Sequence, residues 1–69
     1  MKINDNKIAM QYAESALALA KTLDYKKGIA ISYNSIGLIY HRQGKYQEAL
    51  KNHFASLKIR EEIRHKKDM

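Results

Sequence analysis

Histidine has the widest chemical repertoire of the residue types in this chain, because imidazole binds metal ions and transfers protons near neutral pH. The three histidines are His41, His53 and His65, and they follow one another at intervals of twelve residues. A metal pair on one helix needs ligands three or four residues apart, whereas twelve residues of helix separate two side chains by about 18 Å. The spacing therefore predicts surface or half-buried histidines, and we expect no bound metal ion and no other cofactor.

The remaining candidates for catalysis are equally poor. The chain has no cysteine, which excludes disulfides, thiolate metal sites and thiol catalysis. Glu61 and Glu62 are adjacent, so they project from different faces of a helix and do not form a carboxylate pair. No Ser-His-Asp context, phosphate-cradling glycine loop or zinc-protease motif occurs. These observations predict that the chain is not an enzyme.

The charge balance is basic, with 13 Lys and Arg against 7 Asp and Glu and a net charge of +6. Acidic residues (Glu61, Glu62 and Asp68) interrupt the densest basic segment, and no aromatic residues interleave with the bases as a stacking groove requires. A mixed-charge, solvated surface is the favoured interpretation, and we expect no nucleic acid as partner. A small basic DNA-binding helical protein remains an alternative, which a steep salt dependence of DNA affinity would support.

No apolar run in the sequence is long enough for a membrane span, so we expect no membrane association. The start of the sequence shows neither the apolar run nor the small-residue cleavage site of a secretory signal. Together with the absence of cysteine, this favours a cytoplasmic location.

Helical periodicity extends over almost the whole chain and predicts an all-α fold of three helices, at about 5–26, 29–43 and 46–66. Short turns between helices force each one to run antiparallel to its neighbour. The positions with helical spacing are Ala9, Ala13, Ala16, Leu17, Ala20 and Leu23, then Ile29, Tyr33, Ile36, Gly37, Ile39 and Tyr40, and finally Tyr46, Ala49, Leu50, His53, Leu57 and Ile63, with Phe54 and Ile59 beside them.

Capping residues mark the ends of these helices. Asn4 or Asp5 suits the N-cap of the first helix, because a short polar side chain accepts hydrogen bonds from the first free amides. Gly28 and Gly44 suit the left-handed position that follows the last turn of a helix. The sequence therefore predicts a glycine cap after the first helix and another after the second.

An internal repeat of forty residues relates the first helix to the third. The paired residues fall on the face that each helix would bury. Ala9 aligns with Ala49, Met10 with Leu50, Leu17 with Leu57, Leu19 with Ile59, and Leu23 with Ile63. The first and third helices are therefore predicted to be the same structural element, with the second helix between them.

The segment 30–59 resembles a tetratricopeptide repeat. Residues 33–40 read Tyr-Asn-Ser-Ile-Gly-Leu-Ile-Tyr, similar to the first helix (helix A) of the family, and residues 43–50 read Gln-Gly-Lys-Tyr-Gln-Glu-Ala-Leu, similar to its turn and second helix (helix B). The forty-residue spacing is similar to the kinesin-light-chain type. The resemblance implies a helical-hairpin repeat fold in the helix order B-A-B, about one and a half repeats in a single module over 1–69.

The resemblance also implies which residues pack the helices together. Gly37 and Ala49 match the small positions where helices A and B cross, since larger side chains would separate the axes. The full set of implied packing residues is Tyr33, Ile36, Gly37, Tyr40, Tyr46 and Ala49. The chain departs from the family at His53, where Phe or Tyr is usual, and at Ser56, where Ala is usual.

In this family, some residues of helix A do not face the core. These residues form a groove that binds an extended peptide or a partner helix. Helical spacing places Asn34, Leu38 and His41 on one stripe, with Ile31 one turn earlier and Arg42 beside it. An Asn amide pairs with any peptide backbone, and Arg binds a carboxylate in forked geometry. These five residues are the predicted groove, and a protein or peptide is the expected partner.

A single repeat unit cannot bury its own apolar face, so neighbouring units must cover it. Residues with few expected partners within the chain are Met10, Leu19, Phe54, Ile59 and Ile63. We therefore expect either a section of a longer repeat array or a homo-oligomer, most simply a two-fold dimer. The favoured function is a non-catalytic protein–protein interaction scaffold, which the resemblance associates with signalling, and the alternative within the same fold is a purely structural self-assembling helical module.

Overall fold

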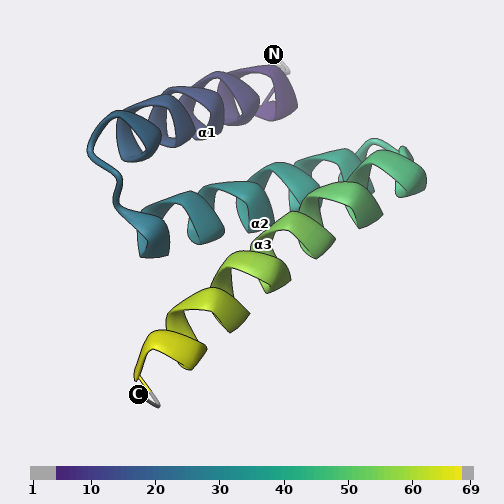
Figure 1. Ribbon diagram of the computed structural model, residues 1–69. Coiled ribbons are helices and arrows are strands. Elements are labelled where there is room, and N and C mark those ends of the chain that lie inside the picture. The colour runs from purple at the N-terminus through teal and green to yellow at the C-terminus, as the bar shows by residue number, and fades with distance from the viewer. Residues whose placement is uncertain (1–4, 68–69) are drawn as a thin grey trace.

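The computed structural model describes residues 5–67, and all regular structure among them is helical. The three helices are α1 (Asp5–Thr22), α2 (Lys26–Arg42) and α3 (Tyr46–Lys67). Consecutive helices run in opposite directions, and α2 lies between the other two (Figure 1). Both α1 and α3 pack on α2, while their backbones do not approach each other. The predicted all-α fold of three helices is therefore confirmed.

The α1–α2 turn differs from the sequence prediction. Helix α1 ends at Thr22 because Asp24 adopts a left-handed conformation with φ of 52°. The backbone N–H of Tyr25 donates to the carbonyl of Ala20 at 2.9 Å, which closes a Schellman motif around Asp24. The prediction that Gly28 caps this helix is therefore wrong, because Gly28 lies inside α2. A Cβ at Gly28 would lie 2.7 Å from the Tyr25 ring, so this glycine permits close packing.

The α2–α3 turn contains the predicted glycine cap. Gly44 has φ of 80°, and the N–H of Lys45 donates to the carbonyl of Tyr40 at 2.9 Å. This is the same motif as in the first turn, with glycine in the place of the left-handed aspartate. Of the two proposed N-caps, Asn4 lies outside the described residues, and Asp5 is the first residue of α1.

The core between α1 and α2 is small and is built on alanine. Ala13 of α1 is buried against Ile36 and Ile39 of α2, and its small side chain permits a close approach of the two helices. Ala9 and the larger side chains of Met10, Leu17 and Tyr40 are partly buried against this contact. Leu23, which the periodicity places on the same face, follows the last residue of α1 and is exposed.

The interface between α2 and α3 is also made of small residues. Gly37 and Ala30 of α2 are buried, as are Ala49 and Ser56 of α3. The Ser56 hydroxyl donates to the carbonyl of Ala30 at 2.8 Å, so the polar group that replaces the family's usual alanine is satisfied in the interior. No buried side-chain N or O atom among the described residues lacks a partner.

The Ser56 hydrogen bond leads to a stability prediction. The Ala30 carbonyl lies inside α2 and keeps its helical hydrogen bond when the hydroxyl is removed. We therefore expect Ser56→Ala to lower the free energy of unfolding by about 1 kcal/mol or less, as measured by urea denaturation. Ser56→Leu should cost about 1–3 kcal/mol, because Ser56 is only 3% exposed and has no room for a larger side chain. Equal effects of the two substitutions would contradict the packing described here.

Candidate functional site

The histidine that departs from the family pattern fills the crossing of α2 and α3. A Cβ built on Gly37 would lie 3.0 Å from the His53 ring and 3.1 Å from the carbonyl oxygen of Ala49. His53 Nδ1 lies 2.9 Å from Asn34 Oδ1, where the ring N–H donates to the amide oxygen. The imidazole thus occupies the space of the usual aromatic ring and is anchored to α2. As a result, the Asn34 amide oxygen already has a partner within the chain.

The predicted packing residues occupy different depths in the structure. Ile36, Gly37 and Ala49 are buried, and Tyr33 and Tyr40 are half-buried. Tyr46, expected to fill space beside the helix crossing, is exposed instead. Its ring makes an edge contact with His41 at 5.1 Å between centroids, so this residue of the predicted groove has an aromatic neighbour at the start of α3.

The exposed face of α2 forms what we call the α2 stripe, which consists of Lys27, Ile31, Leu38 and Arg42. Ile31 and Leu38 are 50% and 48% exposed, a high value for large apolar side chains in the middle of a helix. Helix α2 contains no Asp or Glu, so the stripe is apolar at its centre and basic at both ends. Three of the five predicted groove residues lie on this stripe.

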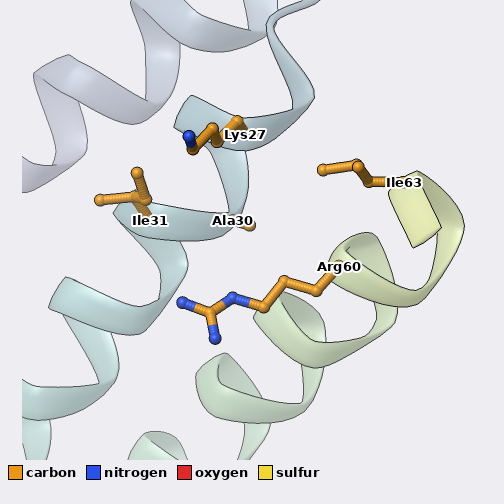
Figure 2. A pocket seen from close by; sticks show the side chains of 5 residues that line it. All are labelled: Lys27, Ala30, Ile31, Arg60 and Ile63. Carbon is orange, nitrogen blue, oxygen red and sulfur yellow. The ribbon is translucent and has the colours of Figure 1, made fainter. Parts of the chain in front are cut away.

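Helices α2 and α3 are close at the Gly44 turn and diverge toward the end of α3, so that together they form a V (Figure 1). The open end of the V holds a cavity of about 350 Å³, which we call the α2–α3 cleft. Its lining residues are Lys27, Ala30, Ile31, Arg60 and Ile63 (Figure 2). The α2 stripe therefore leads into this cleft at the N-terminal end of α2.

Some charged side chains around the α2–α3 cleft form an ion pair and others do not. Lys26 forms an ion pair with Glu62 at 3.7 Å, which joins the two helices beside the cleft. Both side chains are substantially exposed, so this pair contributes at most about 1 kcal/mol to stability. Lys27 and Arg60 form no ion pair with any other residue of the described chain. The two cations of the cleft are therefore available to a ligand.

A second exposed apolar face lies on α3. It consists of Tyr46, Leu50, Phe54 and Leu57, which we call the α3 stripe. The residues are spaced by four, four and three positions, so they follow one side of the helix. Each is between 50% and 63% exposed. Exposed apolar side chains in such a run are typical of interaction surfaces.

The forty-residue repeat identifies what this face is built to contact. Leu50 and Leu57 of the α3 stripe are the repeat equivalents of Met10 and Leu17 in α1. Met10 and Leu17 pack on the core of α2. Two of the four residues of the α3 stripe, Leu50 and Leu57, therefore correspond to positions through which α1 holds α2, and no helix of the described chain covers them.

The predicted self-association residues divide into two groups. Leu19 and Phe54 are exposed, but Met10 is partly buried against α2, and Ile59 and Ile63 are half-buried. Met10, Ile59 and Ile63 are thus partly covered within the chain, while Leu19 and Phe54 remain exposed. The difference arises because α3 has apolar residues on two faces, and the face with Ser56, Ile59 and Ile63 turns toward α2.

Sequence reasoning missed four residues of these surfaces, namely Lys27, Arg60, Leu50 and Leu57. The sequence did contain a signal for the two leucines, because their repeat equivalents, Met10 and Leu17, belong to α1, which packs on the helix that follows it. No comparable signal marked Lys27 and Arg60, because they lie 33 positions apart and only the V of α2 and α3 brings them to one cavity.

The described residues contain neither a cluster of three or more His, Asp or Glu side chains suited to a metal ion nor a helix that is long and apolar enough for a membrane span.

Comparison with known proteins agrees with this architecture. A family model described as tetratricopeptide repeat matches residues 4–62, which is most of the chain. Neither the curated proteins nor the solved structures gave a match. The match to the family model agrees with the three antiparallel helices and with the small residues at their crossings. The chain belongs to the tetratricopeptide repeat family, whose repeats are typically non-catalytic modules of protein–protein interaction.

Proposed function

We propose that this chain is a non-catalytic scaffold that associates with other proteins by stacking a helix on the α3 stripe. The bound helix would resemble α2 in having small and branched apolar residues on its buried face, because α2 is what the equivalent face of α1 holds. The forty-residue repeat and the 22-residue α3 support the long, kinesin-light-chain-like type of repeat.

The exposure of the α3 stripe is the observation that carries this proposal. Burying a large apolar side chain contributes about 1.5–3 kcal/mol, so covering four of them is a substantial driving force for association. In a repeat array the following unit supplies the covering helix. When the chain is alone in solution, a second copy is the available source, and a two-fold dimer is the simplest closed assembly.

The oligomeric state in solution tests this proposal. We expect light scattering at micromolar concentration to give a mass above the 8.0 kDa of one chain, and the mass should fall on dilution. A monomer that unfolds cooperatively on heating would contradict self-association, because it would show that the fold is stable with its apolar faces uncovered.

The α2 stripe supports a second mode of binding, the capture of an extended peptide. Ile31 and Leu38 offer apolar contacts, and Arg42 offers a forked partner for a carboxylate. A purely structural self-assembling module, the alternative function within this fold, would associate through the α3 stripe but bind no peptide on α2. The two surfaces lie on different helices, so each can be tested without disturbing the other.

A further inference from the structure

We infer that the α2–α3 cleft binds an acidic side chain that neighbours a branched aliphatic residue in a partner peptide. The inference rests on the proposed binding of an extended peptide to the α2 stripe, and it names the chemistry that one end of that surface recognises.

Two cations from different helices face the same cavity. Lys27 comes from the first turn of α2, and Arg60 extends its guanidinium from α3 across the opening toward α2 (Figure 2). A guanidinium forms two parallel hydrogen bonds to a carboxylate, and an ammonium adds a flexible point charge. Arg60 is therefore the direct partner for a carboxylate in the cleft, and Lys27 adds positive charge at its edge.

The local electrostatics favour an anion at this position. The nearby carboxylate of Glu62 is already paired with Lys26, at 3.7 Å, and α2 contains no acidic residue. The N-terminus of α2 also has no side-chain cap, so its free amide groups leave positive partial charge beside the cleft. A bound carboxylate would therefore meet three sources of positive potential.

The lining of the cleft adds an apolar requirement. Ala30 is buried, Ile63 is half-buried and Ile31 is half-exposed, so the walls between the two cations are aliphatic. A volume of about 350 Å³ is near the lower limit for ligand sites, which suits one or two side chains of a peptide. No aromatic ring lines the cleft, so it lacks the stacking surface by which proteins hold nucleic-acid bases.

The test uses two short peptides with amidated C-termini that differ at one position. One contains Glu next to Ile, and the other contains Gln next to Ile. We expect fluorescence anisotropy to show about tenfold tighter binding of the Glu peptide, which corresponds to about 1.4 kcal/mol. Arg60→Gln should remove most of this preference, Lys27→Gln should remove a smaller part of it, and Arg60→Lys should retain part of it.

Arg64→Gln is the matched control, because Arg64 is an exposed arginine of the same helix that does not line the cleft. It should leave the preference unchanged, and all variants should keep the helical circular dichroism of the parent chain. Equal binding of the two peptides, or equal effects of Arg60→Gln and Arg64→Gln, would overturn the inference.

Three further outcomes separate the alternatives. If both peptides bind equally and Leu38→Asp abolishes their binding, the cleft inference fails while peptide binding on α2 stands. If neither peptide binds, both the cleft inference and the proposed capture of a peptide by the α2 stripe fail. Binding only of peptides with a free C-terminal carboxylate, or displacement of the peptide by short duplex DNA at physiological salt, would also overturn the acidic side chain as the ligand.

Discussion

Replacing Gly37 by leucine is expected to lower the free energy of unfolding by about 1–2 kcal/mol, after the gain in helix propensity is subtracted. A Cβ at this position would already lie 3.0 Å from the His53 ring and 3.1 Å from the Ala49 carbonyl oxygen. The backbone of α3 cannot yield locally, and the ring is held by its hydrogen bond to Asn34. Leucine would have to push the two helices apart at their crossing.

Two effects of opposite sign meet in this substitution. Leucine favours helix over glycine by up to about 1 kcal/mol, while overpacking of a tight contact costs about 1–3 kcal/mol and occasionally more. We expect the steric cost to exceed the gain, because at Gly37 backbone and an anchored ring lie in the way. In a domain of 69 residues, such a loss is a large part of the total stability.

Urea denaturation followed by circular dichroism measures the effect. Gly44→Asn is the control, because no atom lies within 4 Å of a Cβ built there and Asn tolerates the positive φ of 80°. It should change the free energy of unfolding by less than about 1 kcal/mol. A Gly37→Leu chain as stable as the parent would show that α2 and α3 do not cross at this glycine.

The proposed self-association through the α3 stripe predicts that Leu57→Glu yields monomers of 8.0 kDa under conditions in which the parent chain associates. Leu57 is half-exposed in the single chain, so the fold should survive the substitution. At an interface, however, the new carboxylate would be buried without a partner, which costs several kcal/mol. The expected result is therefore a large change in assembly with little change in helical content.

Light scattering at matched concentrations measures this change. Gln11→Glu is the control, because it adds the same charge to an exposed position of α1 away from the α3 stripe. Its mass should equal that of the parent chain. A Leu57→Glu chain that remains associated would show that the contact lies elsewhere, for instance on the exposed face of α1 that carries Tyr12 and Leu19.

The three-helix architecture could be predicted from the sequence because its signals are local. Apolar spacing of three and four residues specifies helices, and Gly44 specifies the second turn through its left-handed backbone. The forty-residue repeat showed that the first and third helices are equivalent. Three of the four residues of the α2 stripe, Ile31, Leu38 and Arg42, were also predicted from the sequence.

Only the tertiary structure decided which apolar faces are covered. The residues of α3 are apolar on two sides, so periodicity alone could not distinguish the face with Ile59 and Ile63 from the face with Leu50 and Leu57. The first turn was equally ambiguous, because Asp24 tolerates the conformation for which Gly28 is the more obvious candidate.

The α2–α3 cleft is the clearest case of a feature beyond the reach of sequence reasoning. Lys27 and Arg60 meet at one cavity because α3 diverges from α2 along its length. The divergence depends on side-chain volumes at the crossing, where Gly37 and Ala49 bring the helices together. Local spacing determines which helices form, while the angle between them results from the packing of residues that are distant in the chain.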